Sequence, residues 1–119
     1  PEKTVTEIKF EKIEINEGYA VKESNGDFII TIELKNSGST DATIAEVYVN
    51  YKLSDQYGAN INVRGQSKAL AEPPKRQDDN SIGTVSISIS GDLWQSGTVI
   101  DIEFHSAASK DYLVMLTLP

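Results

Sequence analysis

In residues 27–35 a large apolar side chain occupies every second position, namely Phe28, Ile30, Ile32 and Leu34. In a β-strand successive side chains point to opposite faces, whereas the apolar positions of an α-helix recur every three or four residues. The spacing therefore predicts a strand with one buried face, and it excludes an amphipathic helix over these residues.

Similar alternation recurs along the rest of the chain, in segments rich in the β-branched and aromatic residues that favour strands. The pattern predicts about seven strands, and no helix longer than residues 66–72. Short strands without helical crossovers favour an all-β fold, namely an immunoglobulin-like antiparallel β-sandwich built as a single domain over residues 1–119, with a β-barrel as the alternative. The other expected strands cover residues 19–23, 45–53, 60–64, 85–89, 100–104 and 112–118.

The N-terminal segment changes face within its own length, because Ile8 and Phe10 share one parity whereas Ile13 and Ile15 share the other. A β-bulge, or a switch of the chain from one sheet to the other, would produce such a change. We therefore expect an irregularity near residues 11–12.

Two further features have a structural and a functional interpretation. The polar loop over residues 65–80 is expected to be either a crossover between the sheets or an arm that contacts a partner, since structureless loops of this length are usually functional or mobile. Trp94, the only tryptophan, is expected either to cover one end of the sandwich or to anchor a partner. The sequence leaves both pairs of alternatives open.

Composition excludes several classes of function. The formal net charge is −7, which disfavours nucleic acid and anionic membrane surfaces as partners. The chain has no cysteine, so thiol catalysis, thiolate metal sites and disulfides are excluded. His105, the only histidine, is expected to lie exposed on a strand, and no nucleophile motif accompanies it. The acidic loops lack the spacing of a calcium-binding loop, so we expect no catalytic residue, metal site or cofactor.

The outward positions of the predicted strands suggest an interaction surface. If residues 45–53 bury Ala45, Val47, Val49, Tyr51 and Leu53, the opposite faces of the third strand and of the last two strands carry apolar side chains. These strands share one sheet in an immunoglobulin-like sandwich, and an exposed apolar patch commonly marks a binding site. The predicted protein interface, for a second copy or another protein, consists of Ile44, Tyr48, Val99, Leu113 and Met115.

Three segments of the chain carry a resemblance to a known family. Residues 33–44 read Glu-Leu-Lys-Asn-Ser-Gly-Ser-Thr-Asp-Ala-Thr-Ile, and Val-Tyr-Val-Asn follows at residues 47–50. Residues 96–102 and 105–112 read Ser-Gly-Thr-Val-Ile-Asp-Ile and His-Ser-Ala-Ala-Ser-Lys-Asp-Tyr. From about residue 28 onward, the chain resembles the extracellular domains of archaeal type IV pilin-like proteins, a group that includes archaellins, adhesive pilins and the archaellum accessory proteins FlaF and FlaG.

The resemblance implies a β-sandwich held in the archaeal cell envelope by an N-terminal hydrophobic helix that precedes Pro1, which is the expected link to the membrane. The chain has no Asn-x-Ser/Thr glycosylation site, which favours an accessory protein over a glycosylated filament subunit. The resemblance then implies a non-enzymatic anchoring or stator module between membrane and surface layer. Its expected partners are the surface-layer protein, a sister accessory subunit, or a second copy in a homodimer.

Two alternatives to this accessory role stay open. The first is the outer domain of a type IV pilin or archaellin, in which the missing helix would polymerise into a filament. The second is a carbohydrate-binding or other adhesive β-sandwich, for which Trp94, Tyr19 and Tyr57 are the available aromatic residues.

Overall fold

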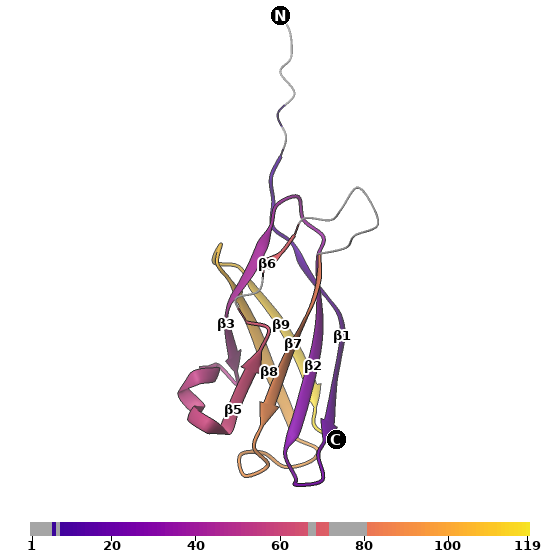
Figure 1. Cartoon of the computed structure of the whole chain (residues 1–119), viewed down its shortest axis with the longest axis vertical. Coiled ribbons are helices and arrows are strands. Elements are labelled where there is room, and N and C mark those ends of the chain that lie inside the picture. The colour runs from indigo at the N-terminus through magenta and orange to yellow at the C-terminus, as the bar shows by residue number, and fades with distance from the viewer. Residues whose placement is uncertain (1–5, 7, 67–68, 72–80) are drawn as a thin grey trace, which may run out of the picture.

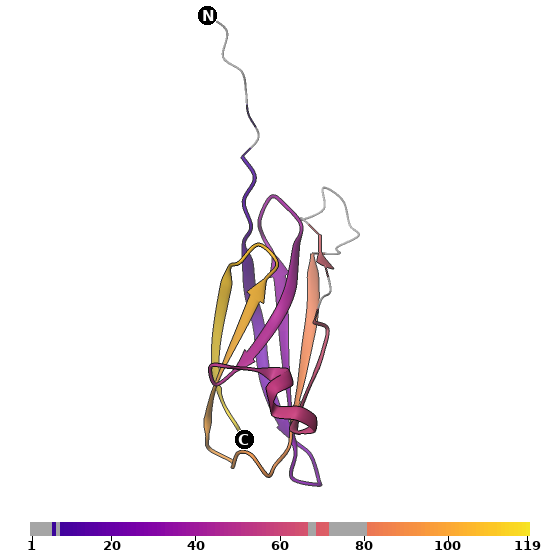
Figure 2. The same ribbon diagram turned by 90° about the vertical axis from the view of Figure 1, so that its left-hand side faces the viewer.

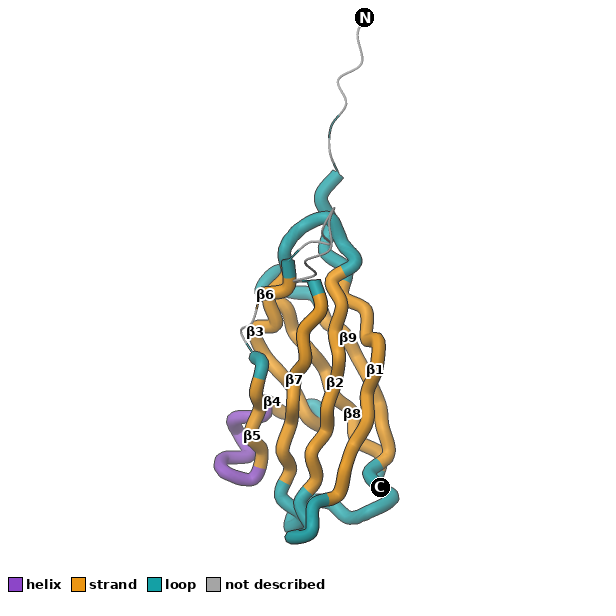
Figure 3. The backbone as a smooth tube through the Cα atoms, turned by 45° about the vertical axis from the view of Figure 1, so that its right-hand side comes forward, coloured by secondary structure: helices purple, strands orange, loops and turns teal. Residues whose placement is uncertain are grey.

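The computed structural model describes residues 6, 8–66, 69–71 and 81–119, which form two antiparallel sheets packed face to face (Figures 1 and 2). The first sheet has the strand order β1-β2-β7-β5 and is seen face-on in Figure 3. The second has the order β4-β3-β8-β9, with β6 paired to β3. The strands are β1 (Ile13–Lys22), β2 (Phe28–Asn36), β3 (Ala42–Val49), β4 (Lys52–Leu53), β5 (Ile61–Arg64), β6 (Ala69–Leu70), β7 (Ile82–Ile89), β8 (Val99–Ser106) and β9 (Asp111–Thr117); the 3-10 segment η1 (Ser54–Asn60) follows β4.

This arrangement confirms the predicted all-β sandwich. The strand orders match the immunoglobulin pattern, in which the first, second, fifth and fourth principal strands form one sheet and the remaining ones form the other. Among the described residues there are nine strands rather than about seven, because the two-residue strands β4 and β6 were not predicted as separate elements.

The core lies between the sheets and is built from the alternating positions. Phe28, Ile30, Ile32 and Leu34 are each at most 1% exposed, and they face a second layer that includes the fully buried Phe104. Complete burial of a large apolar side chain contributes about 1.5–3 kcal/mol to folding, so this alternation is the main source of stability. The alternation predicted for β2 is therefore confirmed at every position.

In the first half of the third strand, the prediction of which side chains face the core is wrong. Ile44 was expected to face solvent, but it is 1% exposed and belongs to the core. The cause is a β-bulge, because Ile44 pairs with Ser106 whereas Glu46 pairs with the adjacent His105, which leaves Ala45 as an extra residue. A bulge shifts the alternation by one position, so Ile44 and Val47 both point inward.

The prediction also extended this strand too far. β3 ends at Val49, and Asn50 and Tyr51 have φ angles of 48° and 67°. Two residues with positive φ between antiparallel strands are typical of a type I′ hairpin turn. Tyr51 therefore lies at the turn and is 79% exposed instead of buried.

The N-terminal irregularity lies elsewhere than expected. Ile8 and Phe10 are 78% and 48% exposed, and the first strand begins only at Ile13. The register shift in β1 falls between Ile15 and Glu17 rather than near residues 11–12. Residues 8–12 instead run along the loop after β2, where the N–H groups of Ser37 and Ser39 donate to backbone carbonyls of this segment.

Much of the polar loop predicted over residues 65–80 lies outside the described residues, namely residues 67–68 and 72–80. Where the loop is described, residues 69–70 form β6, which pairs with β3, so the short helix considered for residues 66–72 is not formed there.

Candidate functional site

The solvent-facing side of the second sheet, called here the outer face, carries four of the five residues predicted as an interface. Val99, Leu113 and Met115 are 51%, 65% and 67% exposed, and Tyr48 is partly exposed. Ile44 is not part of this surface, because the bulge in β3 turns it into the core.

Strand register determines which of these residues lie together. Glu103 is paired with Tyr48 on one side and with Leu113 on the other, so a carboxylate separates the tyrosine from β9. Leu113 and Met115 are neighbours on the same face of β9, and Val99 lies diagonally across from Met115. The contiguous apolar surface therefore consists of Val99, Leu113 and Met115, which we call the edge strip.

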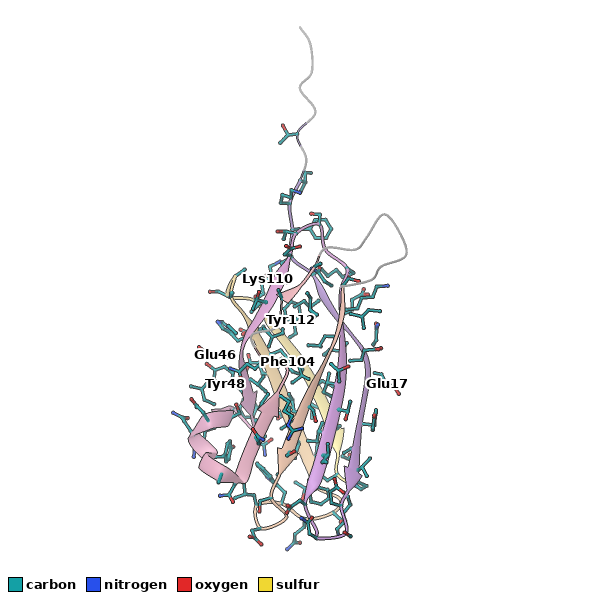
Figure 4. The ribbon with its side chains drawn as sticks, viewed as in Figure 1. Glu17, Glu46, Tyr48, Phe104, Lys110 and Tyr112 are labelled. Atoms are coloured by element: carbon teal, nitrogen blue, oxygen red, sulfur yellow. The ribbon has the colours of Figure 1, made fainter. Side chains whose placement is uncertain are left out.

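Three carboxylates of the outer face each contact an aromatic side chain. The Tyr48 hydroxyl donates to Glu46 Oε2 at 2.9 Å, and His105 Nδ1 lies 2.6 Å from Asp111 Oδ1. Hydrogen bonding to Asp101 and the charge of its carboxylate raise the pKa of Tyr51. Figure 4 shows Tyr48 and Glu46 together on one flank of the molecule.

These pairs were missed by the sequence analysis, because one of them joins two strands and another joins a turn to a strand, and the sequence does not reveal how these segments are placed against each other. One signal was available: Asn50 is a typical residue for a hairpin turn with positive φ, and it would have placed Tyr51 on the surface.

His105 lies among acids rather than beside a nucleophile. The hydrogen bond to Asp111 is the main cause that raises the pKa of His105, and the charges of Asp111, Glu46 and Glu103 act in the same direction, whereas partial desolvation lowers it. A histidine whose protonated form is stabilised by neighbouring carboxylates suits an electrostatic contact better than it suits general base catalysis.

The backbone of β9 offers hydrogen-bonding groups along an open edge. The Ser106 N–H donates to the Lys110 carbonyl, and the Leu118 N–H donates to the Thr98 carbonyl. Since antiparallel ladders alternate, the even-numbered residues of β9 point their backbone groups towards β8 and the odd-numbered ones point theirs away. Within the described part of the chain β9 pairs only with β8, so the groups of Leu113 and Met115 face an unpaired edge.

The other sheet edges are better protected than β9. β1 carries a register shift and the charged residues Glu14, Glu17 and Lys22, whereas β4 has two residues and β5 has four. Bulges, charges and short length are the usual devices that prevent unwanted pairing of an edge strand. β9 has seven residues, no bulge and no charge between Asp111 and Thr117, so it is the edge most suited to pairing.

Trp94 packs against the core, and its ring centroid lies 5.6 Å from that of Tyr57, as expected for a residue that covers the end of the sandwich. No group of His, Asp or Glu among the residues described could hold a metal ion. None of the helical segments described is long and apolar enough to span a membrane. No family model matches the chain, and no curated protein is similar to it in sequence.

Proposed function

We propose that this domain is a non-enzymatic binding module that docks on another protein through the edge strip and the open edge of β9. The observation that carries the proposal is the exposure of Leu113 and Met115, at 65% and 67%, on an unprotected strand edge. Strand addition would satisfy the free backbone groups, and apolar contacts would give the pairing its selectivity.

The family resemblance suggests what the partner is. We propose the surface-layer protein of an archaeal cell envelope, or a sister accessory subunit, with the domain acting as an anchor of the archaellum between membrane and surface layer. An N-terminal helix upstream of this chain would attach it to the membrane. The alternative is the outer domain of a pilin or archaellin.

Pairing with a second copy is also compatible with the geometry of β9. If two β9 strands paired antiparallel about Val114, Leu113 of one copy would face Met115 of the other, and Asp111 would face Thr117. No like charges would oppose each other, and the four apolar side chains would form one cluster across the two-fold axis. A homodimer is therefore part of the proposal.

Sedimentation equilibrium tests the proposal, with the domain alone and mixed with solubilised surface-layer protein. We expect self-association or co-sedimentation, and we expect the double variant Leu113→Glu, Met115→Glu to abolish it. The matched control is Tyr19→Glu, Val21→Glu, which places two acids at comparably exposed positions of β1 on the other sheet, where the wild-type residues are 49% and 51% exposed.

The outcomes separate the candidate functions. Equal loss of association in both double variants would mean that added charge, not the β9 edge, is responsible, and would contradict the proposed surface. A monomer that does not bind surface-layer protein would contradict the anchor function and favour the filament subunit.

A further inference from the structure

A cleft of about 450 Å³ is lined by the β1–β2 turn and the loop that joins β7 to β8. Both loops lie at the end of the sandwich opposite the N-terminal segment (Figure 1, bottom). The volume of the cleft is within the range of small-molecule sites in proteins. It shares no residue with the β9 edge strip. Its lining includes Lys22, Asp27, Asp92, Trp94 and Gln95.

The two walls of the cleft are fixed to each other. Asp27 Oδ1 accepts a hydrogen bond from the Gly91 N–H at 2.9 Å, and the Asp27 N–H donates to Asn25 Oδ1 at 3.0 Å. The backbones also approach closely, since a Cβ added to Gly91 would lie 2.3 Å from the Gly26 carbonyl oxygen. A ligand would therefore meet a preformed site and would not bear the cost of ordering the loops.

Polar groups and two aromatic residues, Phe28 and Trp94, line the cleft. Trp94 is half-buried, its ring lies beside that of Tyr57, and it is one of the residues that line the cleft. Neither the Asp92 carboxylate nor the Gln95 side-chain amide forms a hydrogen bond with the residues that the structure describes. The Lys22 ammonium donates to Ser96 Oγ at 3.1 Å, which holds a further donor at the rim.

The charges of the cleft disfavour an anionic ligand. Asp27 and Asp92 carry two negative charges against the single positive charge of Lys22, so an anionic ligand such as a phosphate would be repelled. An apolar ligand would leave the carboxylate and amide groups desolvated without partners. Carboxylate, amide and ammonium groups beside an indole are instead suited to a pyranose ring, whose hydroxyls form hydrogen bonds at the edge while its C–H face packs on the aromatic ring.

We propose that this cleft binds a short neutral saccharide, with Trp94 as the stacking surface and Asp92 and Gln95 as the hydrogen-bonding residues. This activity is separate from the protein docking proposed for β9.

The single tryptophan makes the proposal directly measurable. The chain is titrated with maltotriose, cellotriose, chitotriose and mannotriose while the fluorescence of Trp94 is followed, and an array of neutral and acidic glycans covers other sugars. We expect a saturable fluorescence change with at least one neutral oligosaccharide, confirmed by calorimetry. Asp92→Ala and Gln95→Ala should each weaken binding about tenfold, as loss of a hydrogen bond predicts.

Asp55→Ala is the matched control, since Asp55 is an exposed acid on η1 outside the cleft, and it should retain wild-type affinity. Absence of neutral-glycan binding on the array and in calorimetry would overturn the proposal, as would binding to acidic glycans alone or binding unchanged in the Asp92→Ala, Gln95→Ala double variant. The Leu113→Glu, Met115→Glu variant should still bind the saccharide, so the failure of one proposal is distinguishable from the failure of the other.

Discussion

The Tyr112 hydroxyl donates a 2.8 Å hydrogen bond to Glu11 Oε1, joining the last strand of the second sheet to the segment that enters the first. Glu11 is only 8% exposed, and Lys110 Nζ donates to the Glu11 backbone carbonyl at 2.9 Å. Burial and this hydrogen bond both raise the pKa of Tyr112. The contact closes the seam between β1 and β9 at one end, and Figure 4 shows Lys110 and Tyr112 close together there.

Tyr112→Phe should destabilise the domain by about 1–2 kcal/mol, because it leaves a largely buried carboxylate without its donor. Urea unfolding followed by Trp94 fluorescence measures the change. Tyr19→Phe is the control, since that side chain is half-exposed and forms no hydrogen bond with the described residues, and it should leave the midpoint unchanged. Equal midpoints for Tyr112→Phe and wild type would show that the bond is energetically neutral.

Ile44→Ala should cost about 2–4 kcal/mol, as expected for truncation of a fully buried aliphatic side chain. Met115→Ala should change stability by no more than about 0.5 kcal/mol, because the methionine is exposed. Denaturant unfolding of the two variants distinguishes the bulged β3 from the uninterrupted alternation expected from sequence. If Ile44→Ala were as mild as Met115→Ala, the bulge would be wrong.

Gly91→Ala should destabilise the domain by about 1–3 kcal/mol, because the new methyl group would be forced against the Gly26 carbonyl oxygen. Gly97→Ala is a useful comparison: Gly97 has φ of 86° and open space around it, so only backbone strain of about 1 kcal/mol acts there. Thermal unfolding ranks the two. A larger loss of stability for Gly97→Ala than for Gly91→Ala would mean that the β7–β8 loop readily moves away from the β1–β2 turn.

The pair formed by His105 and Asp111 should make stability depend on pH. The pKa of His105 is raised in the folded state, so the pair contributes fully below the ordinary histidine pKa, and its contribution is lost as pH rises through the raised value. Asp111→Asn should therefore destabilise the domain at about pH 5.5 and have little effect at about pH 9. In a His105→Gln background the same substitution should show no such pH dependence, and a dependence that persisted there would assign the effect to another group.

Sequence reasoning was most successful where a strand is regular and least successful where backbone geometry departs from an ideal strand. The alternation from Phe28 to Leu34 predicted β2 completely, because both the pairing and the burial of that strand are uninterrupted. At Ala45 a small apolar residue suits either face, so nothing in the composition of β3 indicated the bulge. The error at Ile44 followed directly from that ambiguity.

The outer face was only partly predictable for a different reason. Exposure of Val99, Leu113 and Met115 follows from parity within single strands, which is local information. The contact between His105 and Asp111 depends on the register of a hairpin, and the separation of Tyr48 from Leu113 depends on the order of three strands. These relationships arise only from tertiary structure.

The strand order also determines how this chain must acquire its structure. β2 pairs with β7 and β3 pairs with β8, so the central ladder of each sheet joins segments from opposite halves of the sequence. The long segment of chain between the two paired strands must close before each ladder can form, which makes the folding rate dependent on non-local contacts. Among the described residues neither half of the chain contains a complete sheet, so we expect that two fragments divided between these halves would not be stable on their own.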